Sequence, residues 1–575
     1  MLPEFFCMPK RTGNFKTKNR NSKSFKNDQA RRKYVFVTGG VMSGVGKGIA
    51  SSSIGTILQA KGFKVTAIKI DPYINVDAGT MNPTEHGEVF VLKDGDETDQ
   101  DMGNYERFLN MDLTRTNYMT TGRVYQEVIR KERNLEYKGK NVEVVPDIPK
   151  EVIKRIKKAT EEADADITLI EIGGTIGEYQ NIIFVEAARM LKSELPDDVA
   201  FVMVSYLPIP SKVGEMKTKP TQTAARMLNS VGVQADVIIA RSDVPLDKKR
   251  KEKIATFCNI KSDHVISAPD VESIYDVPIN FEKDNLGNIL CNVLNVKLKK
   301  NKPDLKNWKS FVRKSKNGNK KINIAVVGKY FDSGDFVLSD VYISVLEAIK
   351  YSGYKNNVRP IIHYINSKNI ENGSMKTSSL KKYDGILVPG GFGEAGIEGI
   401  IEAIKYAREN KIPYFGLCYG MQLLVLEFAR NVAKIKDAHT AEIKPDAKNL
   451  IIDIMPEQKD LMKNKDYGGT MRLGSYPAIL KKGTIARKAY GHIEVSERHR
   501  HRYEVNPEYI AKLNDAGLEF SGTSPDHRLM EIAELPRNVH PFFLGTQFHP
   551  EFQARPLAPH PLFSEFIKAC SKNKK

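Results

Sequence analysis

Short β-branched runs alternate along the chain with stretches whose apolar residues have helical spacing. The first run, Tyr34–Thr38, predicts a strand and leads into glycines. A helix is predicted over 49–58, ended by Gly62, and a second strand over 64–70. Strand–helix–strand units in this order build parallel sheets. The pattern therefore predicts that the fold begins with a parallel α/β unit.

The same alternation continues through most of the chain. Further strands are predicted over 167–172, 200–204, 236–240, 322–328, 360–365, 385–388 and 413–417, and further helices around 152–156, 223–228 and 397–409. The predicted fold class is α/β, with two doubly wound parallel-sheet domains.

Periodicity lapses between the two series, where lysine, asparagine and serine dominate residues 299–321. This composition is typical of a linker between domains. The predicted organisation is a basic tail over 1–33, a first domain over 34–298, the linker, and a second domain over 322–575. The tail has ten Lys or Arg residues and only two acidic ones, which predicts a disordered extension. An arm that binds nucleic acid or polyphosphate is the alternative.

Composition narrows the class of protein. Hydrophobic residues make up 41% and charged residues 27%, an ordinary globular balance. The five cysteines are scattered, so we expect no disulfide framework and a cytoplasmic location. No uncharged apolar run is long enough to predict a membrane span. The chain has a net charge of +18, and the part of this charge that lies outside the tail is spread thinly. This distribution favours polyanionic small molecules as partners over a requirement for nucleic acid.

A glycine-rich segment, Thr38–Gly48, lies where the first strand turns into a helix. Glycines let backbone N–H groups approach phosphates, and Lys47 is placed to meet the outer phosphates of a nucleotide. The spacing differs from that of a standard Walker A loop, and Gly48 stands where a serine or threonine usually binds magnesium. The segment predicts a phosphate loop; a bare glycine turn is the alternative.

Carboxylates must then supply more of the metal binding. Asp94–Asp101 is an acidic cluster, and Glu171 lies inside an apolar strand that runs into two glycines. These carboxylates are candidate metal ligands of a phosphoryl-transfer site, with a solvated acidic loop as the alternative for the cluster. Lys69–Asp77 and Lys217–Gln222 have the composition of anion sites, and for them a triphosphate site and a surface loop both remain open.

A second candidate site surrounds Cys418. The segment Gly416–Gly420 follows an apolar strand and precedes an apolar helix, which is the pattern of a nucleophile elbow. A helix N-terminus favours the thiolate, and His549 with Glu551 supplies a base and a group to orient it. Gly390 and Gly391 follow another strand and can offer N–H groups to an oxyanion. A buried structural cysteine is the alternative.

Several longer segments together carry a resemblance to a known family. They are Phe36–Val41, Lys69–Asp77, His86–Val91, Tyr105–Phe108, Thr121–Arg123, Arg130–Arg133, Lys217–Gln222, Gly468–Gly474 and Arg498–Asn506. On these motifs, residues 34–570 resemble the CTP synthase family. The resemblance implies a P-loop-type amidoligase domain fused to a class I glutamine amidotransferase domain.

The implied activity is that of a ligase of pyrimidine biosynthesis. ATP, with Mg²⁺, phosphorylates UTP at the carbon-4 oxygen, and ammonia then displaces the phosphate to give CTP. The ammonia is free or is released from L-glutamine and carried through an internal tunnel. The resemblance also implies allosteric activation by GTP, feedback inhibition by CTP and a homotetramer formed through the synthase domain.

Roles of individual residues follow from the resemblance by position. It implies ATP contacts at Gly44, Val45, Gly46, Lys47, Gly48, Ile49, Asp101 and Val271, and magnesium ligands at Asp101 and Glu171. It implies contacts with UTP or CTP at Ser43, Glu178, Tyr179, Gln180, Lys217, Thr218, Lys219, Pro220, Thr221, Gln222 and Lys253, and a tunnel-lining position at His86. It implies glutamine contacts at Gly391, Tyr419, Gly420, Met421, Gln422, Glu442 and Arg502, and a catalytic triad of Cys418, His549 and Glu551.

The chain departs from the family pattern at several positions. Gly44 stands where many members have serine, Ala78 replaces a proline, and Glu178–Gln180 differs from the usual acidic motif. Glu394 and Ala395 lie where a loop often presents an arginine implicated in the GTP response. Another fused amidoligase–amidotransferase, such as a cobyric acid amidase, and an inactive paralogue that serves as a binding or filament protein are the competing interpretations.

Overall fold

A computed structural model describes residues 32–212, 214–298, 304–318, 320–329, 332–333, 336–337, 339–455, 458 and 468–573. The predicted tail therefore lies outside the described residues, apart from its last two. Lys33 is a correction to that prediction, because it is the first residue of strand β1, is buried, and bonds Asp198 at 2.7 Å.

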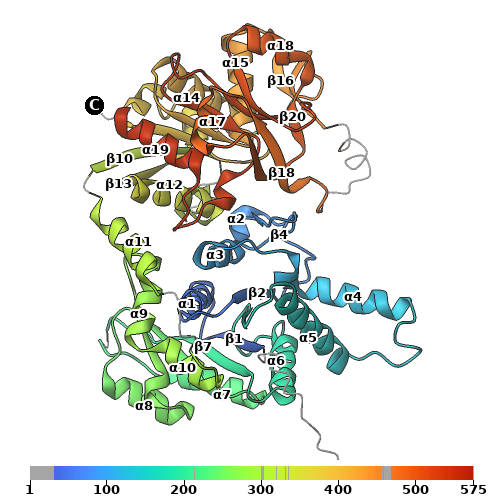
Figure 1. Cartoon of the computed structure of the whole chain (residues 1–575), viewed down its shortest axis with the longest axis vertical. Coiled ribbons are helices and arrows are strands. Elements are labelled where there is room, and N and C mark those ends of the chain that lie inside the picture. The colour runs from blue at the N-terminus through green and yellow to red at the C-terminus, as the bar shows by residue number, and fades with distance from the viewer. Residues whose placement is uncertain are drawn as a thin grey trace, which may run out of the picture. The chain divides into compact units, whose positions relative to one another are not determined.

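Seven strands form a first sheet in which every neighbouring pair is parallel (Figure 1). In spatial order they are β5 (Tyr118–Thr120), β2 (Val65–Asp71), β6 (Ile167–Ile172), β1 (Lys33–Gly40), β7 (Val199–Tyr206), β8 (Val237–Ser242) and β9 (Val265–Pro269).

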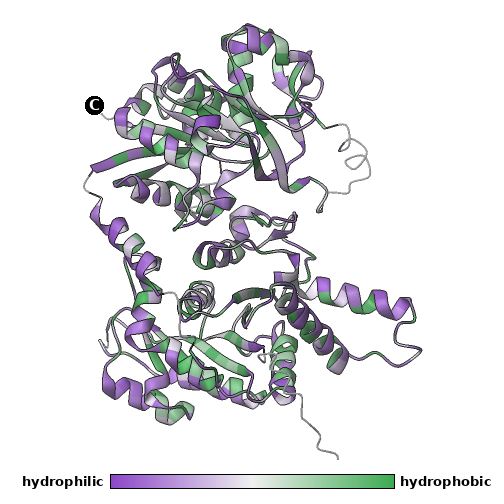
Figure 2. Cartoon of the chain, in the orientation of Figure 1, coloured by the Kyte–Doolittle hydropathy of each residue, from purple (hydrophilic) through white to green (hydrophobic). Residues whose placement is uncertain are grey.

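Both faces of this sheet are covered by helices. Side chains alternate along a strand, so Phe36 joins the core on one face and Val35 and Val37 join the core on the other. The Phe36 core includes residues of α5 (Val144–Glu162), α6 (Ile182–Glu194), α7 (Lys219–Ser230) and α8 (Lys248–Cys258). The opposite core includes residues of α1 (Lys47–Ala60), α3 (Gln100–Leu109), α9 (Val277–Lys283) and α10 (Leu286–Val293). Figure 2 shows apolar strands and a largely hydrophilic α8. The doubly wound arrangement is therefore confirmed for this sheet.

A second sheet of nine strands contains the cysteine elbow. In spatial order its strands are β13 (Val358–Asn366), β10 (Lys320–Gly328), β14 (Gly385–Val388), β15 (Tyr414–Leu417), β23 (Phe543–Thr546), β22 (Met530–Glu534), β21 (Glu519–Thr523), β18 (Arg472–Leu480) and β19 (Glu494–His501). Its main helices are α12 (Ile343–Lys355), α14 (Ile397–Glu409), α15 (Tyr419–Asn431) and α19 (Pro561–Asn573).

Only part of this second sheet is parallel. The pairs from β13 to β23 are parallel, whereas those from β23 to β19 are antiparallel. The antiparallel extension was not predicted. Its last strand, β19, buries charged and polar side chains such as Arg498 and His499, so hydrophobic alternation does not mark it.

The predicted linker contains a helix, α11 (Lys306–Asn317), that the sequence analysis did not predict. Trp308, Phe311 and Val312 are buried at the i, i+3, i+4 spacing of one helical face. The Trp308 indole donates to the Tyr275 carbonyl at 2.8 Å, and Phe311 contacts Tyr351 of α12 edge-on. Helix α11 therefore packs against elements on both sides of it in the chain.

The predicted bounds of β6, β14 and α14 are confirmed, and most other predicted elements differ by only a few residues. Four cysteines, Cys258, Cys291, Cys418 and Cys570, are buried and free. Within the described ranges, no helix combines the length and apolar character that a membrane span requires.

Candidate functional site

The predicted phosphate loop joins β1 to α1. Gly44 and Gly46 have φ of 68° and 87°, a backbone region that glycine adopts without strain. A side chain at Gly46 would also lie 2.9 Å from Arg241. Lys47 is the first residue of α1, and its ammonium donates to the Gly174 carbonyl at 2.9 Å. The Lys47 ammonium lies in a site with little water, and this burial lowers its pKa.

Asp101 explains why the loop has glycine at position 48. A Cβ built on Gly48 would lie 2.1 Å from Oδ1 of Asp101. The Asp101 carboxylate therefore occupies the space that a serine or threonine side chain would need. The carboxylate of Asp101, in α3, thus takes the position of the missing hydroxyl ligand.

The two candidate metal ligands are held by one lysine. Lys69 donates to Asp101, and to Glu171 at 2.9 Å, while the Tyr105 hydroxyl also donates to Glu171. Burial alone would lower the pKa of Lys69, but the surrounding carboxylates, Asp101 first, raise it well above its usual value. Burial would likewise raise the pKa of Asp101, yet the Lys69 ammonium lowers it. Asp101 is therefore an anion despite its burial.

The rest of the acidic cluster has other partners. Asp96 accepts two hydrogen bonds from Arg123, and Glu97 accepts one from Arg500 at 2.8 Å. Asp99 caps α3 by accepting from the Asp101 N–H. Among the described residues of this cluster, only Asp101 bonds a residue, Lys69, that also bonds Glu171. Those residues contain no group of three or more His, Cys, Asp or Glu side chains arranged to hold a metal.

A cavity of about 280 Å³ adjoins the phosphate loop. It brings Gly46 and Ile49 together with Val271, three of the predicted ATP contacts. Its apolar lining includes Phe281, and an Arg241–Asp270 ion pair at 2.6 Å lies at its edge. Arg241 and Asp270 were missed by the sequence analysis. They lie at the carboxyl ends of β8 and β9, where open parallel sheets bind ligands, and that position is the signal that identifies them.

The predicted UTP contacts fall into separate groups. Lys217 donates to Glu215 at 2.7 Å, and this bond, with the charges of Arg250 and Lys253, lowers the pKa of Glu215. Lys217 and Lys253 are thus close to one another, beside the start of α7. Glu178 lies instead beside Gly174, the residue whose carbonyl accepts from Lys47, since its carboxylate would lie 2.6 Å from a side chain on Gly174.

The other predicted UTP contacts are exposed or buried away from these groups. Tyr179 is 96% exposed, and Gln180 and Ser43 are also exposed. Thr221 is buried within α7 and bonds the Ser205 hydroxyl. No hydrogen bond or ion pair joins these residues to one another in the part of the chain that the structure describes.

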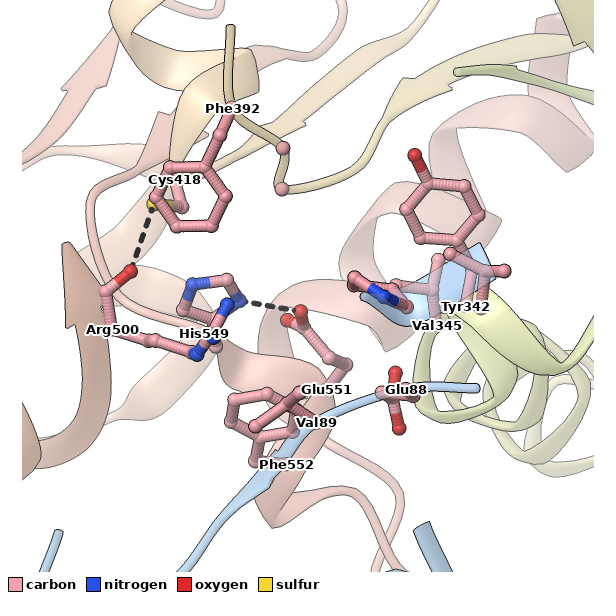
Figure 3. Close-up of a pocket in the computed structure, with 14 residues that line it drawn as sticks. Glu88, Val89, Tyr342, Val345, Phe392, Cys418, Arg500, His549, Glu551 and Phe552 are labelled. Carbon is pink, nitrogen blue, oxygen red and sulfur yellow. Dashed lines mark hydrogen bonds and ion pairs between the residues drawn. The ribbon is translucent and has the colours of Figure 1, made fainter. Parts of the chain in front are cut away.

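Cys418 occupies a strained elbow between β15 and α15, with φ 49° and ψ −99°. A side chain on Gly416 would lie 2.6 Å from the Gly420 backbone, and one on Gly420 would lie 2.4 Å from the Val388 carbonyl. Both glycines therefore allow strand and helix to meet at the sharp turn. The turn directs the Cys418 sulfur into a cavity at the strand ends (Figure 3).

His549 and Glu551 complete the predicted triad. Nδ1 of His549 lies 2.7 Å from Oε1 of Glu551 (Figure 3). Burial would lower the pKa of His549, but Glu551 and the Cys418 sulfur together raise it to about 10. The raised pKa keeps the imidazole protonated near neutral pH. The sulfur also lies 3.7 Å from the Arg500 carbonyl and from the Gln547 amide nitrogen.

The cavity at Cys418 has a volume of about 70 Å³ and is lined from both halves of the chain. Cys418, His549 and Gly391 contribute from the second half, and Glu88 and Val89 from the first. His86, the expected tunnel-lining residue, is exposed at the end of α2 (Pro83–His86) and does not line this cavity. Glu88 was missed because nothing local in the sequence indicates that it faces the cysteine.

The predicted glutamine contacts surround the same loop in part. The Tyr419 hydroxyl donates to the Gly393 carbonyl at 2.8 Å, and the Gly393 N–H donates to Glu442 at 2.6 Å. Arg502 donates to Gln458 at 2.6 Å. Met421 and Gln422 face elsewhere: Met421 packs against Gly545, and the Gln422 amide donates to the Tyr503 carbonyl at 3.0 Å.

Comparisons with known proteins match both halves. Residues 33–296 match the family model described as CTP synthase N-terminus, and residues 337–569 match glutamine amidotransferase class-I. A CTP synthase of Methanococcus aeolicus is 47% identical over 94% of this chain and 99% of its own length. One of Pyrococcus furiosus is 50% identical over 94% of this chain and 98% of its own. The solved glutaminase domain of Trypanosoma brucei CTPS with bound acivicin is 37% identical, covers 44% of this chain and 95% of its own, and has a TM-score of 0.40.

Fold and sites together define a class: a nucleotide-dependent ligase half joined to a class I glutamine amidotransferase half. Within that class, the chain belongs to the CTP synthase family.

Proposed function

We propose that this chain aminates UTP to CTP, using ATP and either glutamine or free ammonia. The observation that carries the proposal is the cavity at Cys418. It is lined by the glutaminase triad and by Glu88 and Val89 of the synthase half, so ammonia released at the sulfur would enter a space bordered by the synthase half. The match of both halves to family models supports the same conclusion.

In this proposal, the synthase domain begins at Lys33 and extends to residue 298, and residues 322–575 form the glutaminase domain, connected by 299–321. The Cys418 thiolate attacks the amide carbon of glutamine, and Gly391 contributes an N–H to the oxyanion. Protonated His549 gives its proton to the departing ammonia, and Glu551 keeps the imidazole oriented. Water then hydrolyses the thioester to glutamate and restores the thiolate.

At the phosphate loop, the carbon-4 oxygen of UTP attacks the γ-phosphorus of ATP, and ADP leaves. Lys47 and the loop N–H groups bind the phosphates, while the cavity at Ile49 and Val271 takes the adenine. Ammonia adds at carbon 4, and phosphate departs in place of an oxygen that would otherwise be a poor leaving group. Lys217 and Lys253 bind the UTP triphosphate, and CTP inhibits by competing for the same contacts.

Asp101 and Glu171 fit a Mg²⁺ ion. Magnesium in nucleotide sites is commonly held by one or two carboxylates and substrate phosphates rather than by a larger protein cage. Here the two carboxylates lie beside the phosphate loop, and the Gly48 contact orients Asp101 toward it. When bound, Mg²⁺ would neutralise charge developing on the transferred phosphoryl group.

Further expectations concern regulation and assembly. GTP would activate glutamine hydrolysis through the loop at Glu394 and Ala395, both exposed. A homotetramer would form through the synthase domain, where Tyr179, Leu135 and Ile129 are large, apolar and more than half exposed. The four buried free cysteines are compatible with a reducing cytoplasm.

An absorbance assay that distinguishes CTP from UTP tests the function. We expect conversion that requires ATP and Mg²⁺ and proceeds with either glutamine or ammonium. An inactive paralogue would give no CTP from either nitrogen source, and that result would overturn the proposal.

A further inference from the structure

Strand β19 directs two arginines into the synthase half of the chain. Arg498 donates to the Val91 carbonyl and to Glu106, and Arg500, two residues further along the same face, donates to Glu97 at 2.8 Å. Both arginines therefore bond residues about 400 positions earlier in the chain. Only Arg500 also lines the cavity at Cys418.

Arg500 contacts the nucleophile of the glutaminase site and the loop beside it. Its carbonyl oxygen lies 3.7 Å from the Cys418 sulfur. Its guanidinium lies over the ring of Phe392, 5.3 Å from the centroid, and Phe392 directly follows the glycine pair of the oxyanion loop. A guanidinium over an aromatic face is attracted by the ring, so this contact restrains the loop.

Glu97, the partner of Arg500, is held in place by residues of the synthase half. The side chains of Glu97 and Arg500 are only 1% and 12% exposed, so their hydrogen bond is charge-assisted and shielded from water. A side chain on Gly79 would lie 2.2 Å from the Glu97 carboxylate, and the Ala78 N–H donates to the Glu97 carbonyl. Glu97 is thus enclosed by the segment that follows β2.

Glu97 is also adjacent in the chain to the candidate metal site. Strand β4 (Glu97–Thr98) is followed at once by Asp99, which caps α3 and bonds the Asp101 N–H at 2.9 Å. Four residues of chain therefore connect the carboxylate that bonds Arg500 with Asp101, and Glu97 and Thr98 at its start are buried. Glu97 is therefore joined to the synthase site along the chain and to the glutaminase site through its carboxylate.

We propose that Arg500 is a positioning residue, held by Glu97, that aligns Cys418 and the oxyanion loop according to the state of the synthase half. The inference rests on the proposed function, because it assigns a partner to the glutaminase site within that reaction. Arg500 acts on the nucleophile and the loop, and Glu97 acts through Arg500.

The consequence is a specific kinetic pattern. Loss of the Glu97–Arg500 bond should lower kcat for glutamine hydrolysis by about tenfold or more, the usual effect of losing a buried charge-assisted hydrogen bond. The KM for glutamine should change little, because neither residue is proposed to contact glutamine. CTP synthesis from ammonia should stay within a few-fold of wild type.

Asp112 offers a matched control at the same contact between the halves. Its carboxylate accepts from Arg498 and Arg555, crosses between the same two halves, and does not line the cavity. Asp112→Asn therefore weakens another Arg–carboxylate pair between the same halves without touching Arg500, although the Asp112 side chain is 43% exposed.

The experiment compares Glu97→Gln with Asp112→Asn in the full chain, measuring glutamine hydrolysis and CTP formation from glutamine and from ammonium chloride. Glu97→Gln keeps the shape of the side chain and removes its charge. We expect kcat for glutamine hydrolysis to fall in Glu97→Gln alone, with ammonia-dependent synthesis retained in both variants. Equal loss with both nitrogen sources, or no loss of hydrolysis, would overturn the inference.

A second variant covers the case in which Glu97→Gln does not fold. Arg500→Lys keeps the positive charge but cannot reproduce the planar contacts of the guanidinium, so it should show the same split. Failure of the proposed function is separately visible, since wild type would then form no CTP at all. Glutamine hydrolysis would still report on the alignment of Cys418 in that case.

Discussion

At the scale of single residues, both sites depend on close contacts that only glycine permits. The backbone of Cys418 lies at positive φ, a conformation that costs roughly 1–3 kcal/mol and is kept by its surroundings. Gly416 and Gly420 make room for the turn, and the Cys418 N–H donates to the Thr546 carbonyl at 2.6 Å. Gly48 makes comparable room for Asp101. Motifs with such local requirements can be recognised in the sequence, which is why the triad and the phosphate loop were predicted.

Replacing the nucleophile should separate the two nitrogen sources. Cys418→Ala cannot form a thioester, so CTP formation from glutamine should fall to background while formation from ammonium persists. Cys258→Ala, which removes a buried thiol from α8, is the matched control and should keep both activities. Glutamine-dependent CTP formation by Cys418→Ala, measured by absorbance, would contradict the assignment of the nucleophile.

A methyl group at position 48 should disable the synthase site alone. In Gly48→Ala the new Cβ would overlap Asp101, so the carboxylate must move away from the phosphate loop. Displacement by about 1 Å can reduce turnover about a hundredfold. We expect CTP formation from either nitrogen source to fall by that order, while basal hydrolysis of glutamine is retained. Normal ammonia-dependent synthesis would show that Asp101 does not need its present position.

At the scale of elements, helix α11 and the first turns of α12 connect the two halves. The buried face of α11 packs against Tyr275 and Tyr351, and the N–H of Ser344 in α12 donates to Glu88 at 3.2 Å. Residues 306–317 of the predicted linker thus form a packed helix. Its polar composition concealed three apolar residues at helical spacing, and a search for periodicity in this short stretch would have found them.

Truncating the buried tryptophan of α11 should destabilise the fold. Trp308→Ala removes a fully packed side chain and a hydrogen bond to Tyr275, and such truncations typically cost about 3–5 kcal/mol. Asn307→Ala, at an exposed position of the same helix, should have little effect. Thermal unfolding followed by circular dichroism compares the two variants. A midpoint for Trp308→Ala equal to that of wild type would mean that α11 does not contribute to stability.

The carboxyl group of Glu88 should make stability depend on pH. Burial raises its pKa from 4.5 to about 7, against the opposing hydrogen bonds from Ser344. Because the folded-state pKa is raised, the stabilising contribution is complete below about 4.5 and is lost as pH rises through about 7. The whole effect is roughly 3 kcal/mol at most.

Glu88→Gln removes this titration and keeps an acceptor for Ser344. The difference in thermal midpoint between wild type and Glu88→Gln should therefore shift in favour of the variant as pH is raised from about 5 to about 8. A difference that is constant across this range would contradict the raised pKa of Glu88.

At the scale of the whole molecule, the parallel strands of both sheets were predictable, whereas the antiparallel extension of the second sheet and the contact between the halves were not. Strands buried on both faces are recognisable in the sequence as short continuous apolar runs. Strand β19 contains the buried Arg498 and the half-buried Arg500, whose partners Glu106 and Glu97 lie about 400 positions away, so no local pattern reveals their direction. Glu88 and Glu97 gain their contacts only when the halves pack. The candidate sites were therefore recognisable as motifs, whereas the residues that join them were not.

The central claim is that nitrogen released at Cys418 is transferred to UTP within this molecule. The most direct measurement is mass spectrometry of CTP formed from glutamine labelled with ¹⁵N in its amide group, with ATP, UTP, Mg²⁺ and GTP, and with unlabelled ammonium in the solution. We expect CTP to carry the heavy isotope at a fraction well above that of the surrounding ammonium. CTP labelled only to the level of the ammonium pool, or labelled glutamine hydrolysed without any CTP, would contradict it.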